Sequence, residues 1–487
     1  MPNPLTLNDL KEAVSGGAAA FRCRIKLQPI GSEGDKVFPP TYAGGVYAVE
    51  DRRVDGRLVR CVLLDSVQSQ ANRMEEALLD VFLPNWRELP ADGDTPCDLP
   101  LIAVQVPNHG WITSLTAPHR IHDAILRDSY LNGASFRRCE IGKAIVAARL
   151  HDATAFYRYC PTVLLFGTWD STGGGGLESA KVPRAVVSEI IGVDITAGVR
   201  TASRIDPLGI RAQSATIYRR TDGGWALKNA DGGWVGAQPE DIEKDKDGKE
   251  KKFGKGKPSD IVHGNVTPDM PRFDRDEIRK QNLGRLTDVL QSNPLKLHYE
   301  VTSRDGRLKS ETSLEGETVR IREGAVKPGG VTGAYALHTW TLSLTQLRRL
   351  RFPVNGTHDD SRNGAARTVL AGMALYALAL QHERGYWLRS RCELIQDTAA
   401  KPAVLERLGT DGKTDDFELP CGKTAKQILD RALEEAEKEG AAKIEWEKKV
   451  IRLTPMEKLV ELVRASDARQ PEEEEELAEA VDAGDQS

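Results

Sequence analysis

The chain has 487 residues, of which 40% are hydrophobic, and a formal net charge of −5, so it is long enough for two to four domains with a sizeable core. Its longest strongly apolar run, residues 369–380, is too short to cross a bilayer. The first residues contain neither the basic nor the apolar region of a secretory leader. These features exclude a membrane-spanning class, and we expect a cytoplasmic protein.

The net charge hides two regions of opposite sign. Residues 471–487 contain eight acidic and no basic side chains, so the rest of the chain carries a formal charge of +3. The seven cysteines are odd in number and far apart in sequence, which indicates neither a disulfide framework nor a Cys-x-x-Cys zinc site. A mildly basic body suits a protein that follows one nucleic-acid strand and packs against copies of itself.

Residues 21–28 alternate strictly between apolar and polar side chains, with Arg22, Arg24 and Lys26 on the polar face. The alternation predicts a half-buried antiparallel strand with one basic face. Ferredoxin-like and RRM-like domains meet RNA with such a face, usually with stacking aromatic side chains. This strand presents no aromatic side chain on that face, so its sequence does not support stacking there.

An apolar strand at 59–64 leads into a polar turn and a helix predicted over residues 69–83. Ser66 and Ser69 are both suitable N-caps, which leaves the helix start open by about one turn. The spacing places Gln70, Asn72 and Arg73 in an exposed first turn. One apolar stripe comprises Ala71, Met74, Ala77, Leu78 and Val81.

The start of this helix has the properties of a phosphate site. A helix N-terminus carries free N–H groups and a partial positive charge. Arg73 adds a full charge, and the Gln and Asn side chains add neutral donors. The alternative is an ordinary capped helix whose polar residues simply face water.

A second helix is predicted over 117–131, where His119 and His122 lie close to Arg120 and Asp123. Such a cluster could support acid–base cleavage of RNA. Histidines three residues apart without a third ligand are a weak zinc signal. Because His119 follows Pro118 in the first turn, contact with phosphate or a helix cap fits it better than catalysis.

The remaining pattern mixes strands and helices without regular alternation, which predicts an α+β architecture. We expect further strands at 45–49, 162–169, 185–193, 212–219, 297–302 and 336–344. Further helices are expected at 345–351, 363–383 and 424–440. Residues 181–220 hold three acidic and seven basic side chains, the latter being Lys181, Arg184, Arg200, Arg204, Arg211, Arg219 and Arg220.

Two loops and a charged C-terminal region interrupt this pattern. Four glycines at 173–176 predict a mobile loop, and Gly422-Lys423-Thr424 lacks the earlier glycine of a P-loop. Residues 220–275 are rich in Gly and Lys and predict a protruding insertion. Residues 424–466 predict one or two charged helices with breaks near Gly440 and Pro455, followed by a disordered acidic tail.

Residues 66–73, Ser-Val-Gln-Ser-Gln-Ala-Asn-Arg, resemble the strand-to-helix motif of CRISPR-associated RAMP superfamily proteins, in which such a turn holds the guide RNA. Other segments resemble the backbone subunit of the type I-G (formerly type I-U) Cascade complex. They are KVFPPTY (36–42), TSLTAPHR with DAILRDS (113–129), LFGTWDS (165–171), PRAVVSEI (183–190), RTASRIDPL (200–208), PSDI with HGN (258–265) and LRRLRF (347–352). The resemblance spans about residues 20–400.

The resemblance implies an RRM-like or ferredoxin-like palm, an antiparallel sheet with helices, formed by residues 1–219 and 276–400. Residues 220–275 would be a thumb-like insertion, with the region near 175–205 as an alternative thumb, and 401–470 a helical extension before the tail at 471–487. With the basic pattern, it assigns RNA contacts to Ser66, Gln68, Ser69, Gln70, Asn72, Arg73, His119, Arg120, Arg127, Lys181, Arg184, Arg200 and Arg204.

The function implied is a crRNA-binding backbone subunit that polymerises head to tail along the guide and presents it to target DNA. Implied partners are further copies of the chain, a fused processing and capping subunit, a large subunit and a helicase-nuclease. We expect no cofactor, no metal, no membrane partner and no catalysis. The alternatives are a free-standing RNA-binding protein, or a RAMP-type RNA endonuclease that uses His119 or, by analogy with target-cutting type III subunits, Asp65.

Overall fold

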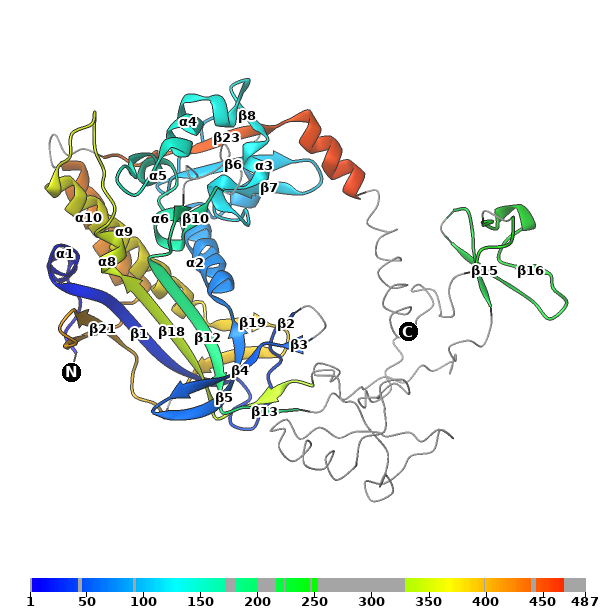
Figure 1. Ribbon diagram of the computed structural model, residues 1–487, viewed down its shortest axis with the longest axis horizontal. Helices are drawn as coiled ribbons and strands as arrows, with labels where there is room; N and C mark the ends of the chain where they lie inside the picture. Colours follow the sequence, from blue (N-terminus) through cyan, green and yellow to red (C-terminus); the bar gives the residue numbers. More distant parts are fainter. Residues whose placement is uncertain are drawn as a thin grey trace, which may run out of the picture. The chain divides into compact units, whose positions relative to one another are not determined.

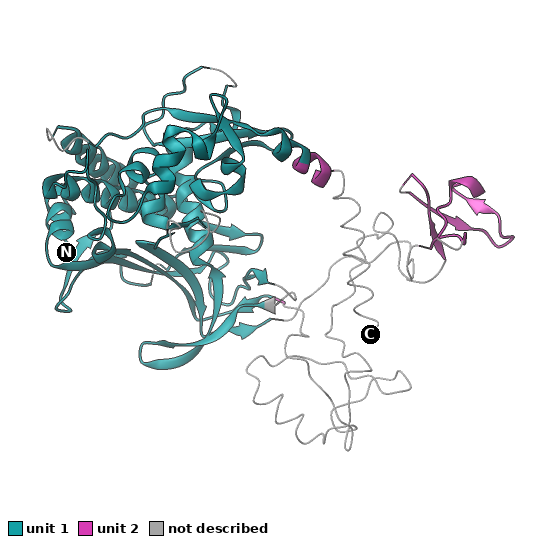
Figure 2. Cartoon of the chain, turned by 45° about the horizontal axis from the view of Figure 1, so that its top comes forward, with its two compact units in different colours: residues 1–198, 330–461 teal, residues 199–329, 462–487 magenta. Residues whose placement is uncertain are grey.

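The computed structural model describes residues 2–42, 46–90, 93–170, 181–198, 216–222, 224–245, 248–252, 329–397, 399–438 and 444–467. The chain divides into two compact units (Figure 2). Unit 1 contains residues 1–198 and 330–461, and unit 2 contains residues 199–329 and 462–487. The strand expected at 297–302, the glycine loop, Arg200, Arg204 and the acidic tail lie outside the described residues.

A nine-stranded antiparallel sheet forms the base of unit 1 (Figure 1). Its strands are β1 (Ala18–Pro29), β4 (Val49–Val54), β5 (Arg57–Asp65), β12 (Val186–Val193), β18 (Tyr335–Ser343), β19 (Tyr386–Arg389), β20 (Cys392–Gln396), β21 (Val404–Gly409) and β22 (Thr414–Glu418). Seven of them follow the order β19-β20-β1-β18-β12-β5-β4, and the β21–β22 hairpin also pairs with β1.

Strand β1 has the two faces that its sequence predicts. Its apolar side chains from Phe21 to Leu27 are fully buried, whereas Arg24 and Lys26 are exposed. The basic face is partly neutralised, because Arg22 pairs with Glu406 at 2.6 Å and Lys26 lies 3.5 Å from Asp397. The fold is α+β, as expected.

Helices cover the apolar face of the sheet (Figure 1). They are α1 (Leu7–Ser15), α2 (Val67–Phe82), the short α8 (Leu344–Leu347), α9 (Asp360–Glu383) and α10 (Gly422–Lys438). Helix α9 is the central one, since α1, α2 and α10 all pack against it. Most of its side chains are buried, in keeping with the apolar character of its sequence. No described helix combines the length and apolar character needed to cross a membrane.

A smaller sheet in unit 1 has the order β7-β6-β23-β8-β9. It comprises β6 (Leu101–Val106), β7 (Gly110–Thr113), β8 (Ser129–Leu131), β9 (Ala134–Ser135) and β23 (Val450–Pro455). Around it lie η1 (Trp86–Glu88), η2 (Arg120–His122), α3 (Ala124–Arg127), η3 (Phe136–Arg138), α4 (Glu140–Ala147), α5 (Thr154–Tyr159) and α6 (Val163–Phe166). Strand β23 runs parallel to β6, within a region expected to be helical only.

Short strand pairs complete the described structure. In unit 1 these are β2 (Thr41–Tyr42) with β3 (Val46–Tyr47), β10 (Thr168–Trp169) with β11 (Lys181–Val182), and β13 (Thr196–Ala197) with β17 (Val331–Thr332). In unit 2, β14 (Ile217–Arg219), β15 (Trp225–Lys228) and β16 (Trp234–Val235) form a small sheet followed by η4 (Pro239–Asp241). This sheet occupies part of the expected insertion.

Three local expectations are wrong. Residues 117–131 form no continuous helix, because the backbone at Arg120 is left-handed (φ 54°) and Asp123 caps the separate helix α3. Half of the strand expected at 162–169 is helix α6, which is capped by Gly167 before β10 begins. Val81, assigned to the buried stripe of α2, is 41% exposed.

Candidate nucleic-acid interface

Helix α2 begins where β5 ends, and the N-cap is Ser66. The Ser66 hydroxyl accepts the N–H of Ser69 at 3.2 Å, and its carbonyl accepts the N–H of Gln70 at 2.8 Å. The N–H groups of Val67 and Gln68 have no acceptor within the described part of the chain, as at any open helix start. Just before the helix, the pairing of β5 with β12 shifts register by one residue: Ile191 is opposite Leu63, but Ile190 is opposite Asp65.

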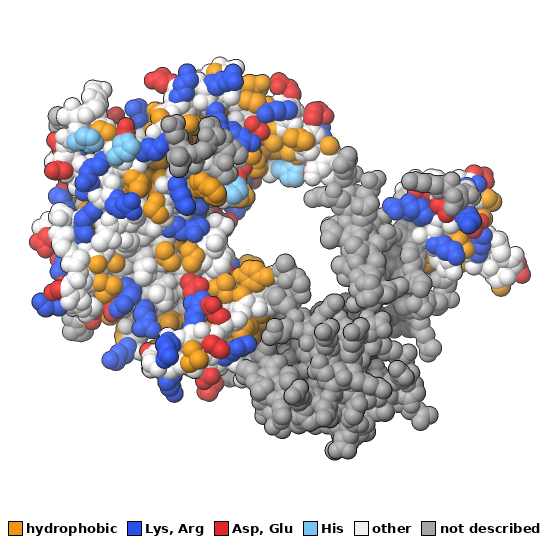
Figure 3. Space-filling view, viewed as in Figure 1, with side chains coloured by type: hydrophobic (Ala, Val, Ile, Leu, Met, Phe, Trp, Pro, Cys, Tyr) orange, Lys and Arg blue, Asp and Glu red, His pale blue; other side chains and the backbone are white. Residues whose placement is uncertain are grey.

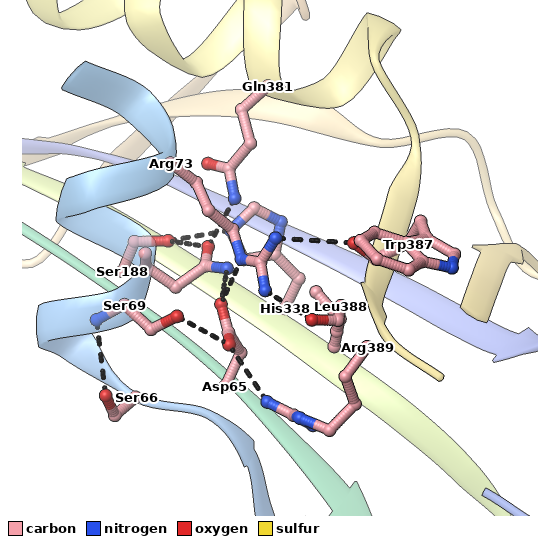
Figure 4. A network of polar contacts seen from close by, with 11 residues as sticks. Asp65, Ser66, Ser69, Arg73, Ser188, His338, Gln381, Trp387, Leu388 and Arg389 are labelled. Carbon is pink, nitrogen blue, oxygen red and sulfur yellow. Dashed lines mark hydrogen bonds and ion pairs between the residues drawn. The ribbon is translucent and has the colours of Figure 1, made fainter. Parts of the chain in front are cut away.

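Asp65 anchors a buried polar network beneath this helix start (Figure 4). Its carboxylate is fully buried and accepts bonds from the Ser69 hydroxyl at 2.8 Å, the Gln70 amide at 2.6 Å and Arg73 Nε at 2.9 Å. Arg389 Nη2 lies 3.4 Å from the same carboxylate. Two guanidinium groups around one carboxylate leave a local excess of one positive charge, and these donors occupy both carboxylate oxygens.

The network continues through Gln70 into the core. The side-chain oxygen Oε1 of Gln70 accepts bonds from the Ser188 hydroxyl at 2.8 Å and from the Gln381 amide at 2.6 Å. Ser188 also contacts His338 Nε2 at 2.8 Å, and His338 Nδ1 contacts the Tyr386 hydroxyl at 3.1 Å. Burial lowers the pKa of His338 to about 3, with a smaller contribution from His382, so this imidazole is neutral near pH 7.

These contacts divide the expected RNA-binding residues of α2 into two groups. Gln68 and Asn72 are exposed, and Ser66, Ser69 and Arg73 are partly exposed. Gln70 is fully buried, so the expectation that it faces solvent in the first turn is wrong. The physical reason is the unmet hydrogen-bonding capacity of Asp65 and Ser188, which a buried amide can satisfy as both donor and acceptor.

Arg120, also expected among the RNA contacts, is buried as well. Its guanidinium forms a two-pronged pair with Glu75 of α2, at 2.7 and 2.6 Å, and donates to the Gly167 carbonyl at 3.3 Å. Burial raises the pKa of Glu75 to about 6, and the charge of Arg120 limits that rise. Arg120 therefore joins α2 to the start of β10 and has little surface left for RNA.

The two histidines near Arg120 lie in different environments. His119 is exposed, with its backbone N–H bonded to Asp123. His122 packs edge-on against Phe156, and burial lowers its pKa to about 4. Arg127, at the end of α3, is partly exposed and lies 3.5 Å from Asp128. The described residues contain no group of three His, Cys, Asp or Glu side chains that could hold a metal ion.

Lys181 and Arg184 lie beside β10. Lys181 is exposed, and its ammonium lies 5.7 Å from the centre of the Trp169 ring. Arg184 is half-buried and donates to the Phe166 carbonyl at 3.1 Å, and burial lowers its pKa. In Figure 3, basic side chains lie around the level of α2, and hydrophobic side chains gather where β19 and the β2–β3 hairpin lie.

Sequence reasoning missed three residues at this interface. Arg389 and Trp387 come from β19, more than 300 residues after α2, and Arg73 binds the carbonyls of Trp387 and Leu388 at 3.3 and 2.7 Å. The alternation of buried Tyr386 and Leu388 with more exposed neighbours is the strand signal that could have found them. Glu75, the partner of Arg120, was also missed, because the two residues are 45 positions apart in the sequence.

Residues 21–197, which include most of β1 and all of α2, α3 and β10, match the family model of CRISPR-associated protein GSU0053. This part of the chain is that of a CRISPR-associated protein. This match confirms the family resemblance at the level of a CRISPR-associated protein and is consistent with a RAMP-type subunit. No curated protein matches the chain. The matched part of the chain contains Asp65, Arg73, Glu75 and Arg120, while Arg389 and Trp387 lie outside it.

Proposed function

We propose that this CRISPR-associated protein is the crRNA-binding backbone subunit of a type I-G Cascade effector. The observation that carries the proposal is the start of α2, where Gln68 and Asn72 are exposed beside the partly exposed Arg73. Helix N–H groups without acceptors, a helix dipole and a fixed guanidinium together favour a phosphodiester ligand. The family match supports the setting in which that ligand is a guide RNA.

In this proposal the buried network holds the interface, and the exposed residues contact RNA. Asp65 binds Nε of Arg73, and the Trp387 and Leu388 carbonyls bind its two Nη atoms, so the guanidinium is held in place before RNA binds and only its remaining N–H bonds can reach a phosphate. Contacts to phosphate and sugar set the register of the strand without reading its sequence. The guide bases then stay available to pair with target DNA, and specificity comes from base pairing.

The assembly follows from the same reasoning. One subunit holds a short RNA segment, and copies joined head to tail form an open helical filament along one guide. The other partners proposed are the fused processing and capping subunit, the large subunit and the helicase-nuclease of the Cascade system. The chain itself performs no chemistry in this scheme, because the Asp65 carboxylate is buried and its oxygens are occupied by donors.

The test is to purify the full chain with a labelled guide RNA and to measure the mass of the complex and the integrity of the RNA. We expect several copies per guide, intact RNA and an affinity that falls steeply with salt. The double variant Gln68→Ala/Asn72→Ala should bind more weakly, since it removes exposed polar contacts and leaves the network intact. Lys413→Ala, at the exposed β21–β22 turn, is a control that removes a cation elsewhere.

Each rival predicts a different result. An endonuclease would shorten the RNA, and His119→Ala or Asp65→Ala would stop the cutting. A free-standing RNA-binding protein would leave one copy on a long RNA. Equal affinity of the wild type and the Gln68→Ala/Asn72→Ala variant would contradict the assignment of the α2 start.

A further inference from the structure

Two tryptophan side chains of unit 1 are conspicuously exposed. Trp169 in β10 is 57% exposed and Trp387 in β19 is 63% exposed. A large aromatic ring that faces water without burial is costly to leave uncovered and is typical of a binding surface. Neither ring takes part in the network at the start of α2.

Both tryptophans lie on segments that are fixed from within. Tyr386 and Leu388, on either side of Trp387, are buried, and the Tyr386 hydroxyl contacts His338 and His382 at 3.1 and 3.0 Å. Thr168 and Asp170, on either side of Trp169, are also buried, and Asp170 pairs with Arg137. The backbone on either side of each tryptophan is therefore fixed. A partner that covers the rings loses little binding free energy to the ordering of these segments.

Helix α2 connects the two segments through two of its ion pairs. Arg73, paired with Asp65, donates to the carbonyl of Trp387. Arg120, paired with Glu75, donates to the carbonyl of Gly167, two residues before Trp169. In Figure 1, β10 and β19 lie near opposite ends of α2. The exposed start of α2 is thus joined by hydrogen bonds to a strand on each side that carries an exposed indole.

We propose that Trp169 and Trp387 are stacking residues for unpaired bases of the single-stranded RNA that the α2 start holds by its backbone. This inference rests on the proposed function and deepens it. Every base has a face that can stack on an indole, so the contact tolerates any guide sequence. The two tryptophans also supply the aromatic side chains that the basic face of β1 lacks.

Charge favours a nucleotide over a second copy of the chain as the occupant. Lys181 lies over the Trp169 ring, and Arg73 donates to the backbone carbonyl of Trp387, so each tryptophan has a cation at its ring or at its backbone for an adjacent phosphate. On β20, Glu393 is directly opposite Trp387, so the charge beside this ring favours phosphate less than the charge beside Trp169 does.

The test measures binding of the full chain to a fluorescent single-stranded RNA and to the same RNA with abasic nucleotides. Trp169→Ala and Trp387→Ala should each weaken binding to the ordinary RNA by about fivefold to a hundredfold. On abasic RNA these variants should bind as well as the wild type, because the wild type has lost the same contact. Phe variants should keep most of the affinity, and Leu58→Ala, which removes a 65% exposed side chain at the β4–β5 turn, should change nothing.

Three results would overturn the inference. In the first, both Trp variants bind ordinary RNA as tightly as the wild type, while Gln68→Ala/Asn72→Ala lowers the affinity. The stacking role is then wrong, and the RNA-binding function stands. If the wild type binds no RNA, the proposed function itself fails. If the Trp variants lose self-association in the absence of RNA but keep full RNA affinity, the tryptophans belong to a contact between copies of the chain.

Discussion

At the scale of single residues, the carboxylate of Asp65 organises the candidate interface. It lies at the end of β5 with no solvent exposure, and it contacts two arginines that come from opposite halves of the chain. A buried carboxylate of this kind adds little net stability compared with an apolar pair, but removing it leaves its partners unsatisfied. Its main effect is to set the position of Arg73 and, through it, of β19.

Asp65→Asn should lower the free energy of unfolding by about 2 to 3 kcal/mol, because Arg73 and Arg389 then lie close together without an anion. Their partial exposure keeps the loss below that of a fully buried pair. Asp51→Asn is the matched control, since Asp51 pairs with Arg60 at the surface and should cost less than about 1 kcal/mol. Urea unfolding measures both, and equal losses would contradict the role of Asp65.

His338 predicts how stability depends on pH. Its pKa is about 3 in the folded chain and 6.5 in an unfolded one, so the unfolded state binds the proton more readily. Stability should therefore fall as the pH drops below 6.5, and at pH 5 this one residue accounts for a loss of about 2 kcal/mol. His338→Gln should remove that part of the difference in urea-unfolding free energy between pH 7 and pH 5. His119→Gln, at an exposed position, should leave the difference unchanged. If His338→Gln also leaves it unchanged, His338 is not the source of the pH dependence.

At the scale of elements, strong periodicity was predictive and short apolar runs were not. Helices α2, α9 and α10 and strands β1, β12 and β18 match their expected ranges closely. Residues 162–169 read as a strand because a short apolar run fits a buried strand or a buried helix equally well. Strand β23 could not be expected, since its parallel partner β6 lies some 350 residues earlier in the chain.

Two helical glycines should respond in opposite ways to alanine. At Gly142 in α4, an added Cβ would lie 1.7 Å from the Phe136 carbonyl oxygen, so Gly142→Ala should cost more than about 2 kcal/mol. At Gly372 in α9, the nearest atom is Leu429 Cα at 3.4 Å, so alanine fits and should add up to about 1 kcal/mol through helix propensity. Thermal unfolding of the two variants measures this contrast, and a loss at both sites would contradict the packing of α9 on α10.

At the scale of the whole molecule, unit 1 is assembled from two distant parts of the chain. The family match covers residues 21–197, yet β18, α9 and β19 from the second part complete the network around Gln70 and Arg73. The sequence identified Ser66, Gln68, Asn72 and Arg73 as a candidate site from local spacing. It could not show that Gln70 and Arg120 are buried, because their partners are fixed by tertiary contacts.

In the proposed function, this chain polymerises along one guide RNA through the start of α2. The most direct measurement is the mass of the complexes that the full chain forms with guide RNAs of increasing length. The number of copies should rise in proportion to RNA length, and the Gln68→Ala/Asn72→Ala variant should need a higher protein concentration to reach the same number. One copy per RNA at every length, or RNA that is cut during the measurement, would contradict the proposed function.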